Sequence, residues 1–108
     1  MTRAAKNKWL VTGFDGVEQI FEARLSSIFS ENELRQMLRC LCSRTLSDDE
    51  IIAGTLRKRM KGYSSVLDVK KDWTKRGALY CGENPHYVAA LFTEYELEDM
   101  DKVDLRDR

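Results

Sequence analysis

The 108-residue chain has one proline, one histidine, three cysteines and no net charge, and each scarcity limits what the protein can be. A composition of 43% hydrophobic residues with so little proline is typical of an ordered domain, because disordered chains bury too little apolar surface to offset their conformational entropy. No apolar run approaches the about 18 residues that cross a bilayer, and no signal-peptide core follows the charged N-terminus Met1–Lys8. Equal numbers of basic and acidic residues exclude the global positive field of a polycationic binder. We therefore expect one small soluble, cytoplasmic domain over residues 1–108 that does not associate with membranes.

The few cysteines and the single histidine limit metal and redox chemistry. An odd number of cysteines at low density is untypical of a disulfide framework and fits reduced thiols in a cytosol. Four zinc ligands could in principle come from Cys40, Cys42, Cys81 and His86. However, residues i and i+2 of a helix point about 200° apart, so Cys40 and Cys42 cannot readily chelate one ion. No cysteine-hydrolase signature surrounds Cys81, and the glycines are too scattered for a phosphate-binding loop. We expect no metal, no cofactor and no enzymatic activity.

The segments Lys8–Thr12 and Val17–Leu25 are rich in apolar, β-branched and aromatic residues. The four residues between them, 13–16, include two glycines that can take a positive φ, so the two segments are predicted to form a β-hairpin. Apolar and charged residues alternate in the second segment, with Ile20 as the exception. One face of this strand is therefore expected to be buried, and it is formed by Val17, Phe21, Ala23 and Leu25.

A helix start signal follows the first hairpin. Ser30 and Glu33 have the Ser-x-x-Glu spacing of a capping box, and apolar residues flank the box as a hydrophobic staple. The signal predicts a helix that begins at Glu31 and ends near Ser43. Its apolar residues fall at i, i+3, i+4 and i+7 and form one stripe: Leu34, Met37, Leu38 and Leu41.

The same signal recurs at Ser47 and Glu50. It predicts a second helix from Asp48 to about Met60, which Gly62 can terminate. The acidic residues of the first turn interact favourably with the helix dipole, and we interpret them as part of the helix start rather than as a catalytic carboxylate pair.

The segment Tyr63–Gly77 permits two interpretations. As a helix, it would be capped by Ser64 or Ser65, would end at Gly77 and would carry an apolar stripe of Val66, Val69 and Trp73. As a strand, its apolar and charged residues alternate poorly. The agreement of the cap, the stripe and the terminating glycine favours the helix.

The segments Ala78–Cys81 and His86–Phe92 flank a turn at residues 82–85 and predict a second β-hairpin. Thr93 and Glu96 again have capping-box spacing, which predicts a short acidic helix over residues 93–108 that frays toward Arg108. The predicted fold class is therefore α+β: an N-terminal β-hairpin, two to three central helices, a second β-hairpin and a short acidic C-terminal helix.

Charge is segregated along the chain although its total is zero. From Arg57 to Arg76 there are eight basic and two acidic residues, a local charge of +6, whereas Glu94–Arg108 has seven acidic and three basic residues, a local charge of −4. Basic groups contact phosphates or carboxylates, and aromatic rings can stack on bases. The candidate binding residues are Arg57, Lys58, Arg59, Lys61, Tyr63, Lys70, Lys71, Trp73, Lys75 and Arg76.

These observations favour a small non-catalytic protein-binding module, such as a regulator or inhibitor of a larger macromolecular machine. The alternative is a nucleic-acid-binding domain that uses the basic stretch 57–76, for example a winged helix whose recognition helix would be Ser64–Arg76. Solvated helix faces would also account for the charges. The identity of the partner and the oligomeric state are left open.

Overall fold

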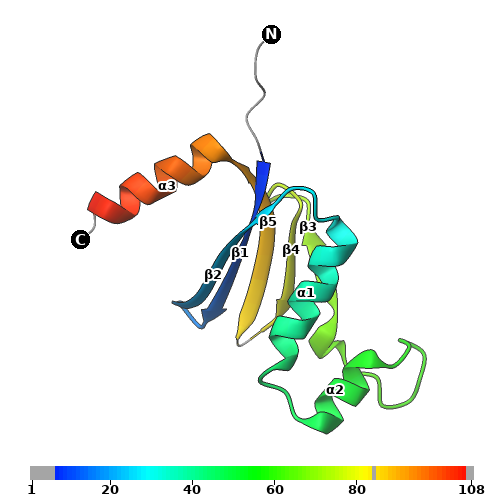
Figure 1. Cartoon of the computed structure of the whole chain (residues 1–108). Coiled ribbons are helices and arrows are strands. Elements are labelled where there is room, and N and C mark those ends of the chain that lie inside the picture. The colour runs from blue at the N-terminus through cyan, green and yellow to red at the C-terminus, as the bar shows by residue number, and fades with distance from the viewer. Residues whose placement is uncertain (1–6, 84, 107–108) are drawn as a thin grey trace.

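A computed structural model describes residues 7–83 and 85–106, with side chains for residues 7–83 and 85–101. Within these residues the fold is α+β, with three α-helices and one antiparallel sheet of five strands (Figure 1). The elements are β1 (Asn7–Asp15), β2 (Glu18–Ser26), α1 (Glu31–Ser43), α2 (Asp48–Thr55), the 3-10 turn η1 (Ser65–Leu67), β3 (Val69–Asp72), β4 (Ala78–Gly82), β5 (His86–Thr93) and α3 (Glu94–Arg106).

Both predicted hairpins are present, but they are parts of a single sheet. The strand order is β2-β1-β5-β4-β3, and the two hairpins join where Val11 of β1 pairs with Ala89 of β5. An isolated hairpin is marginally stable because its strand edges stay unpaired, so joining the hairpins through their central strands gains both backbone pairing and a shared core. The fifth strand, β3, lies in the segment Tyr63–Gly77, for which the sequence favours a helix.

The first hairpin is longer than predicted. Its strands continue through Gly13 and Phe14, where a bulge interrupts the register, and the turn is at Gly16 and Val17. Val17 is fully exposed, so the prediction that it belongs to the buried face is wrong. The other three members of that face, Phe21, Ala23 and Leu25, pack against the core as predicted.

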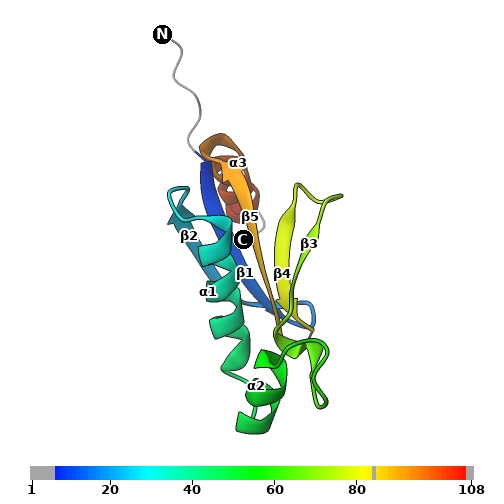
Figure 2. The same cartoon turned by 90° about the vertical axis from the view of Figure 1, so that its right-hand side faces the viewer.

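Helix α1 covers one face of the sheet (Figures 1 and 2). It begins and ends at the predicted residues, and both hydrogen bonds of the Ser30–Glu33 capping box are present. Leu34 and Leu38 are fully buried, and Cys42 is 3% exposed; the other predicted stripe residues, Met37 and Leu41, are partly buried. This packing places α1 against β5 and β4 and beside β3 and η1.

Helix α2 starts at its predicted capping box but ends at Thr55 rather than near Met60. To continue, the helix would need the amide of Arg57 to bond the carbonyl oxygen of Ala53. The amide of Ser64 takes that oxygen instead, at 3.0 Å. The dense positive charge of residues 57–61 also disfavours further helix, because like charges repel at i, i+4 spacing.

The predicted helix over Tyr63–Gly77 is wrong. Ser64 caps the 3-10 turn η1 and not an α-helix, and β3 then pairs with β4, Val69 lying opposite Cys81. Pairing with β4 satisfies the backbone and buries the apolar side chains next to the core, which outweighs the local capping signal. Trp73 is 78% exposed in the following turn, so it takes no part in an apolar stripe. The winged-helix arrangement therefore lacks its recognition helix.

Helix α3 leaves the sheet on the side opposite to α1 (Figure 1). The predicted capping box is present, with reciprocal hydrogen bonds between Thr93 and Glu96. Leu97 is 3% exposed, and Asp101 pairs with Arg24 of β2 at 2.6 Å. The predicted fraying toward Arg108 and the turn residue Asn84 lie outside the described residues, as do the side chains of residues 102–108.

Candidate functional site

A cleft of about 520 Å³ lies between the middle of α1, the end of α2 with the loop that follows it, and the η1–β3 segment. Its walls have a strong charge asymmetry. The lining residues described include one carboxylate, that of Asp68, and five cations: Arg35, Arg39, Arg57, Lys58 and Lys70. Three of these cations come from the predicted basic stretch and two from α1.

Four of the five cations are uncompensated. Arg35 is fixed, because it pairs with Glu31 at 3.1 Å and donates a hydrogen bond to the carbonyl oxygen of Val69 at 3.2 Å. No side-chain hydrogen bond or ion pair joins the other four to any described residue, and we call these four the cleft cations: Arg39, Arg57, Lys58 and Lys70. The cleft therefore presents four charged donors that are available to an anionic ligand.

The one described carboxylate of the cleft is engaged by a neighbour. The hydroxyl of Tyr63 donates a short hydrogen bond to Asp68, and this bond raises the pKa of Tyr63. Asp68 is thus held against the wall at the junction between η1 and β3. The hydrogen bond between Tyr63 and Asp68 stabilises the η1–β3 wall of the cleft, and among the described residues Asp68 forms no ion pair with the cleft cations.

The structure divides the ten predicted binding residues. Four of them line the cleft: Arg57, Lys58, Tyr63 and Lys70. Arg59 and Lys61 are exposed in the loop between α2 and η1, outside the cleft lining, and Lys75 is exposed in the β3–β4 turn.

The remaining three predicted residues are occupied by contacts within the protein. Lys71 pairs with Glu31 at 2.7 Å, and its ammonium lies 4.2 Å from the ring centre of Trp73. Arg76 pairs with Glu96 of α3 at 2.6 Å. Two cations of the basic stretch, Lys71 and Arg76, are therefore already paired with carboxylates of the protein.

Sequence reasoning missed Arg35 and Arg39. They lie one helical turn apart on α1, and this i, i+4 spacing is the signal that both point to the same side. Nothing local shows that this side meets the residues after α2, because that contact depends on how the chain returns through Ser64 and η1.

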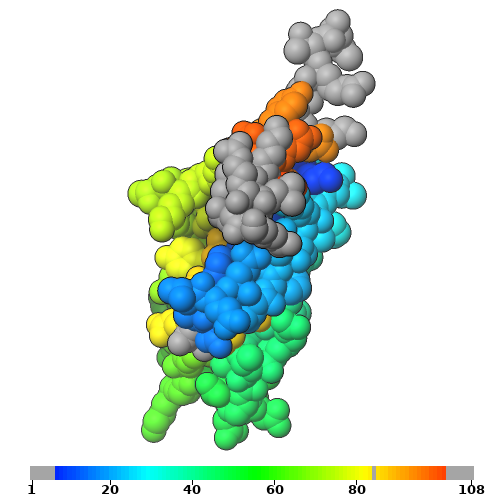
Figure 3. Space-filling model, turned by 90° about the vertical axis from the view of Figure 1, so that its left-hand side faces the viewer, coloured from blue at the N-terminus to red at the C-terminus, as the bar shows by residue number. Residues whose placement is uncertain are grey.

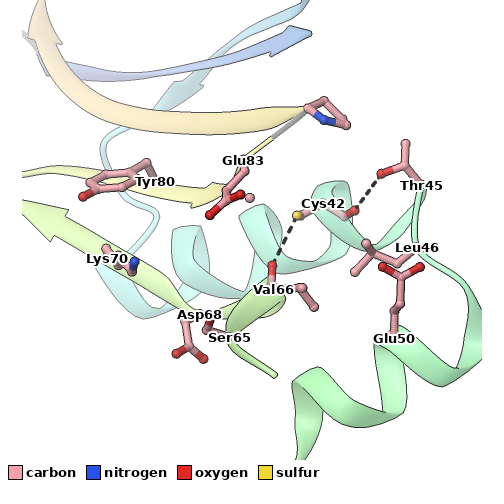
Figure 4. Close-up of a pocket in the computed structure, with 12 residues that line it drawn as sticks. Cys42, Thr45, Leu46, Glu50, Ser65, Val66, Asp68, Lys70, Tyr80 and Glu83 are labelled. Atoms are coloured by element: carbon pink, nitrogen blue, oxygen red, sulfur yellow. Dashed lines mark hydrogen bonds between the residues drawn. The ribbon is translucent and has the colours of Figure 1, made fainter. Parts of the chain in front are cut away.

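A second pocket, of about 420 Å³, lies between the end of α1, η1 and the turn after β4 (Figure 4). Asp68 and Lys70 line both cavities, so the two share the η1–β3 wall. Glu50 also lines the second pocket, but its carboxylate belongs to the capping box, and the Ser47 amide lowers its pKa.

The four residues that could in principle supply zinc ligands do not come together: Cys40, Cys42, Cys81 and His86. Cys42 and Cys81 are buried in the core, whereas Cys40 is exposed on α1. His86 is stacked on Phe14 at 5.3 Å, on the sheet face opposite to α1. Among the residues with described side chains, no three potential ligands come together to hold a metal ion.

Neither a membrane-spanning helix among the described residues nor a known relative points to a function, so function is inferred from the geometry of the cleft. Within residues 7–83 and 85–106, no helix has the length and apolar character needed to cross a bilayer. The sequence matches no known protein family and no curated protein, and the fold matches no solved structure.

Proposed function

We propose that the chain is a non-catalytic protein-binding module whose basic cleft receives an extended acidic segment of a partner protein. The observation that carries this proposal is the gathering of the four unpaired cleft cations around one concave surface. Such a module acts by binding its partner and not by catalysis. It would thereby regulate or inhibit the larger assembly to which the partner belongs.

The physical basis is electrostatic complementarity. Four like charges around one cleft reinforce each other's potential, and the low-dielectric walls focus it, so the cleft attracts carboxylates over a range set by the ionic strength. Each exposed ion pair formed with a ligand contributes about 0.2–1 kcal/mol. The contribution to specificity and to the association rate is larger than the contribution to affinity.

The shape of the site favours an acidic peptide over nucleic acid. Reading duplex DNA requires an element that projects into a groove, such as a helix or a β-ribbon, and here the cations line a hollow. Single strands are held by aromatic rings on which the bases stack. The hydroxyl of Tyr63 is bound to Asp68, and Trp73 lies outside the cleft lining with Lys71 over its ring.

The test measures binding of a fluorescein-labelled decaglutamate peptide by fluorescence anisotropy at low and physiological salt. The cleft variant combines Arg39→Gln, Lys58→Gln and Lys70→Gln. If each lost pair costs about 0.5 kcal/mol, the affinity falls about tenfold. The matched control, Arg59→Gln with Lys61→Gln and Lys75→Gln, removes the same charge outside the cleft and should change the affinity less than about twofold.

Equal loss of affinity in the cleft and control variants would show that the peptide responds to net charge and would refute the proposal. A labelled single-stranded DNA or RNA decamer serves as the competing probe. If either decamer binds much more tightly than decaglutamate and loses affinity selectively in the cleft variant, the site is a nucleic-acid surface.

A further inference from the structure

Two thiols from distant parts of the sequence converge behind η1. The Sγ atoms of Cys42, in the last turn of α1, and of Cys81, in β4, lie 3.7 Å and 4.0 Å from the same carbonyl oxygen, that of Val66. Figure 4 shows the first of these contacts, between two residues that line the second pocket. A helix and a strand thus each present a cysteine to one point in the core.

The side chains of Cys42 and Cys81 are both buried, and Cys42 packs close to the residue that follows Cys81. Cys42 is 3% exposed and Cys81 is 1% exposed, and each thiol contacts the Val66 carbonyl oxygen. A Cβ atom built on Gly82 would lie 2.8 Å from the Cys42 sulfur, so this sulfur rests on the backbone of the residue that follows Cys81. Helix α1 and strand β4 thus hold the two sulfurs on the same side of η1.

We infer that Cys42 and Cys81 form a redox-sensitive dithiol that closes to an intrachain disulfide between α1 and β4. The oxidant is a small-molecule disulfide that enters through the second pocket, which Cys42 lines. This inference does not rest on the binding function of the basic cleft.

The reaction proceeds in two thiol–disulfide exchanges. Cys42 loses its proton, attacks one sulfur of the oxidant and forms a mixed disulfide, and the other half of the oxidant leaves as a thiolate that takes up this proton. Cys81 then loses its proton and attacks the Cys42 sulfur, which releases the second half of the oxidant as a thiol. Two protein thiols are oxidised, and one oxidant disulfide is reduced to two thiols.

Burial sets the rate of this reaction. Desolvation raises the pKa of Cys42, and desolvation with the neighbouring Cys42 raises the pKa of Cys81 to about 12. Because the thiolate is the attacking species, closure is slow at neutral pH and accelerates as the pH rises. The η1 turn should respond to closure, because the Val66 carbonyl loses both of its sulfur contacts.

The test uses the full chain carrying Cys40→Ser, which removes the exposed competing thiol. This chain is incubated in its folded state with oxidised glutathione, and free thiols are counted in denaturant. We expect the thiols to fall from two to none, the mass to show the loss of two hydrogens without added glutathione, and a linked Cys42–Cys81 peptide. The closed form should also unfold at a higher urea concentration, a shift that dithiothreitol reverses.

A second chain, with Cys40→Ser and Cys81→Ala, provides the control and should end as a Cys42–glutathione adduct. The inference is overturned if both thiols of the first chain stay free throughout oxidation, or if they both end as glutathione adducts. A linked peptide that appears only after oxidation in denaturant would overturn it equally.

Discussion

Gly54 shows how a single residue fixes the walls of the basic cleft. A Cβ atom built on Gly54 would lie 2.9 Å from both Cγ and one Cδ of Leu67. Leu67 is 4% exposed, so its side chain already packs closely against its neighbours. The missing side chain therefore lets η1 approach α2 closely enough to form one side of the cleft.

Gly54→Ala should destabilise the protein although alanine is the better helix former. The gain in helix propensity is about 1 kcal/mol, whereas overpacking a core contact costs about 1–3 kcal/mol. Urea denaturation should show a lower midpoint for Gly54→Ala and little change for the exposed control Ile52→Ala. A smaller loss in the double variant Gly54→Ala, Leu67→Val than the two single losses combined would locate the clash at Leu67. A stabilised Gly54→Ala chain would contradict this packing.

Among the elements, α3 depends most on a few charged contacts. Within the described residues, its packing on the rest of the protein rests on buried Leu97 and on the pairs Arg76–Glu96 and Arg24–Asp101. Hydrogen bonds from Arg76, and from the Thr93 amide, lower the pKa of Glu96 to about 2. The ionised carboxylate thus joins the helix start to the β3–β4 turn.

The pH dependence of this contact has a definite sign. Because the folded pKa of Glu96 is depressed, its contribution to stability is complete above the ordinary glutamate pKa of about 4.3 and is lost as the pH falls toward about 2. Wild type should therefore be more stable than Glu96→Gln at neutral pH, and urea midpoints should converge between these two pH values. The exposed Glu98→Gln serves as the control. A difference that persists unchanged at the lowest pH would show that the carboxylate charge plays no part.

The elements predicted correctly are those whose signals are local. All three capping boxes form, because each involves residues three apart in the sequence. The end of α2 and the strand β3 were missed, because they depend on contacts between distant residues, such as the Ser64 amide with the Ala53 carbonyl and Val69 with Cys81. Local propensity is a weak guide when a neighbouring strand offers a full set of backbone partners.

The candidate site was predicted only in part, because it also depends on contacts between residues distant in the sequence. The charge count identified Arg57, Lys58 and Lys70, but it could not show that Arg39 of α1 joins them. Nor could it show that Glu31 and Glu96 neutralise Lys71 and Arg76, because these pairs span 40 and 20 residues.

At the scale of the whole molecule, the basic cleft and the acidic helix α3 lie at opposite ends. Figures 1 and 3 show α2, beside the basic cleft, at one end of the molecule and α3, which has six acidic and two basic residues, at the other. The zero net charge therefore conceals a basic cleft and an acidic helix α3, although Asp48, Asp49 and Glu50 begin α2 and Arg76 contacts α3. An acidic ligand is attracted to one end and repelled by the other, which orients its approach.

Occupancy of the cleft by an acidic peptide can be observed residue by residue in an amide chemical-shift titration of the ¹⁵N-labelled protein with decaglutamate. We expect the largest shifts, saturating with one affinity, at the four cleft cations and at Tyr63 and Asp68, which line the same cleft. Amides of the β3–β4 turn around Lys75 should shift little. Largest shifts at that turn, or shifts spread evenly over all exposed basic residues, would contradict occupancy of the cleft.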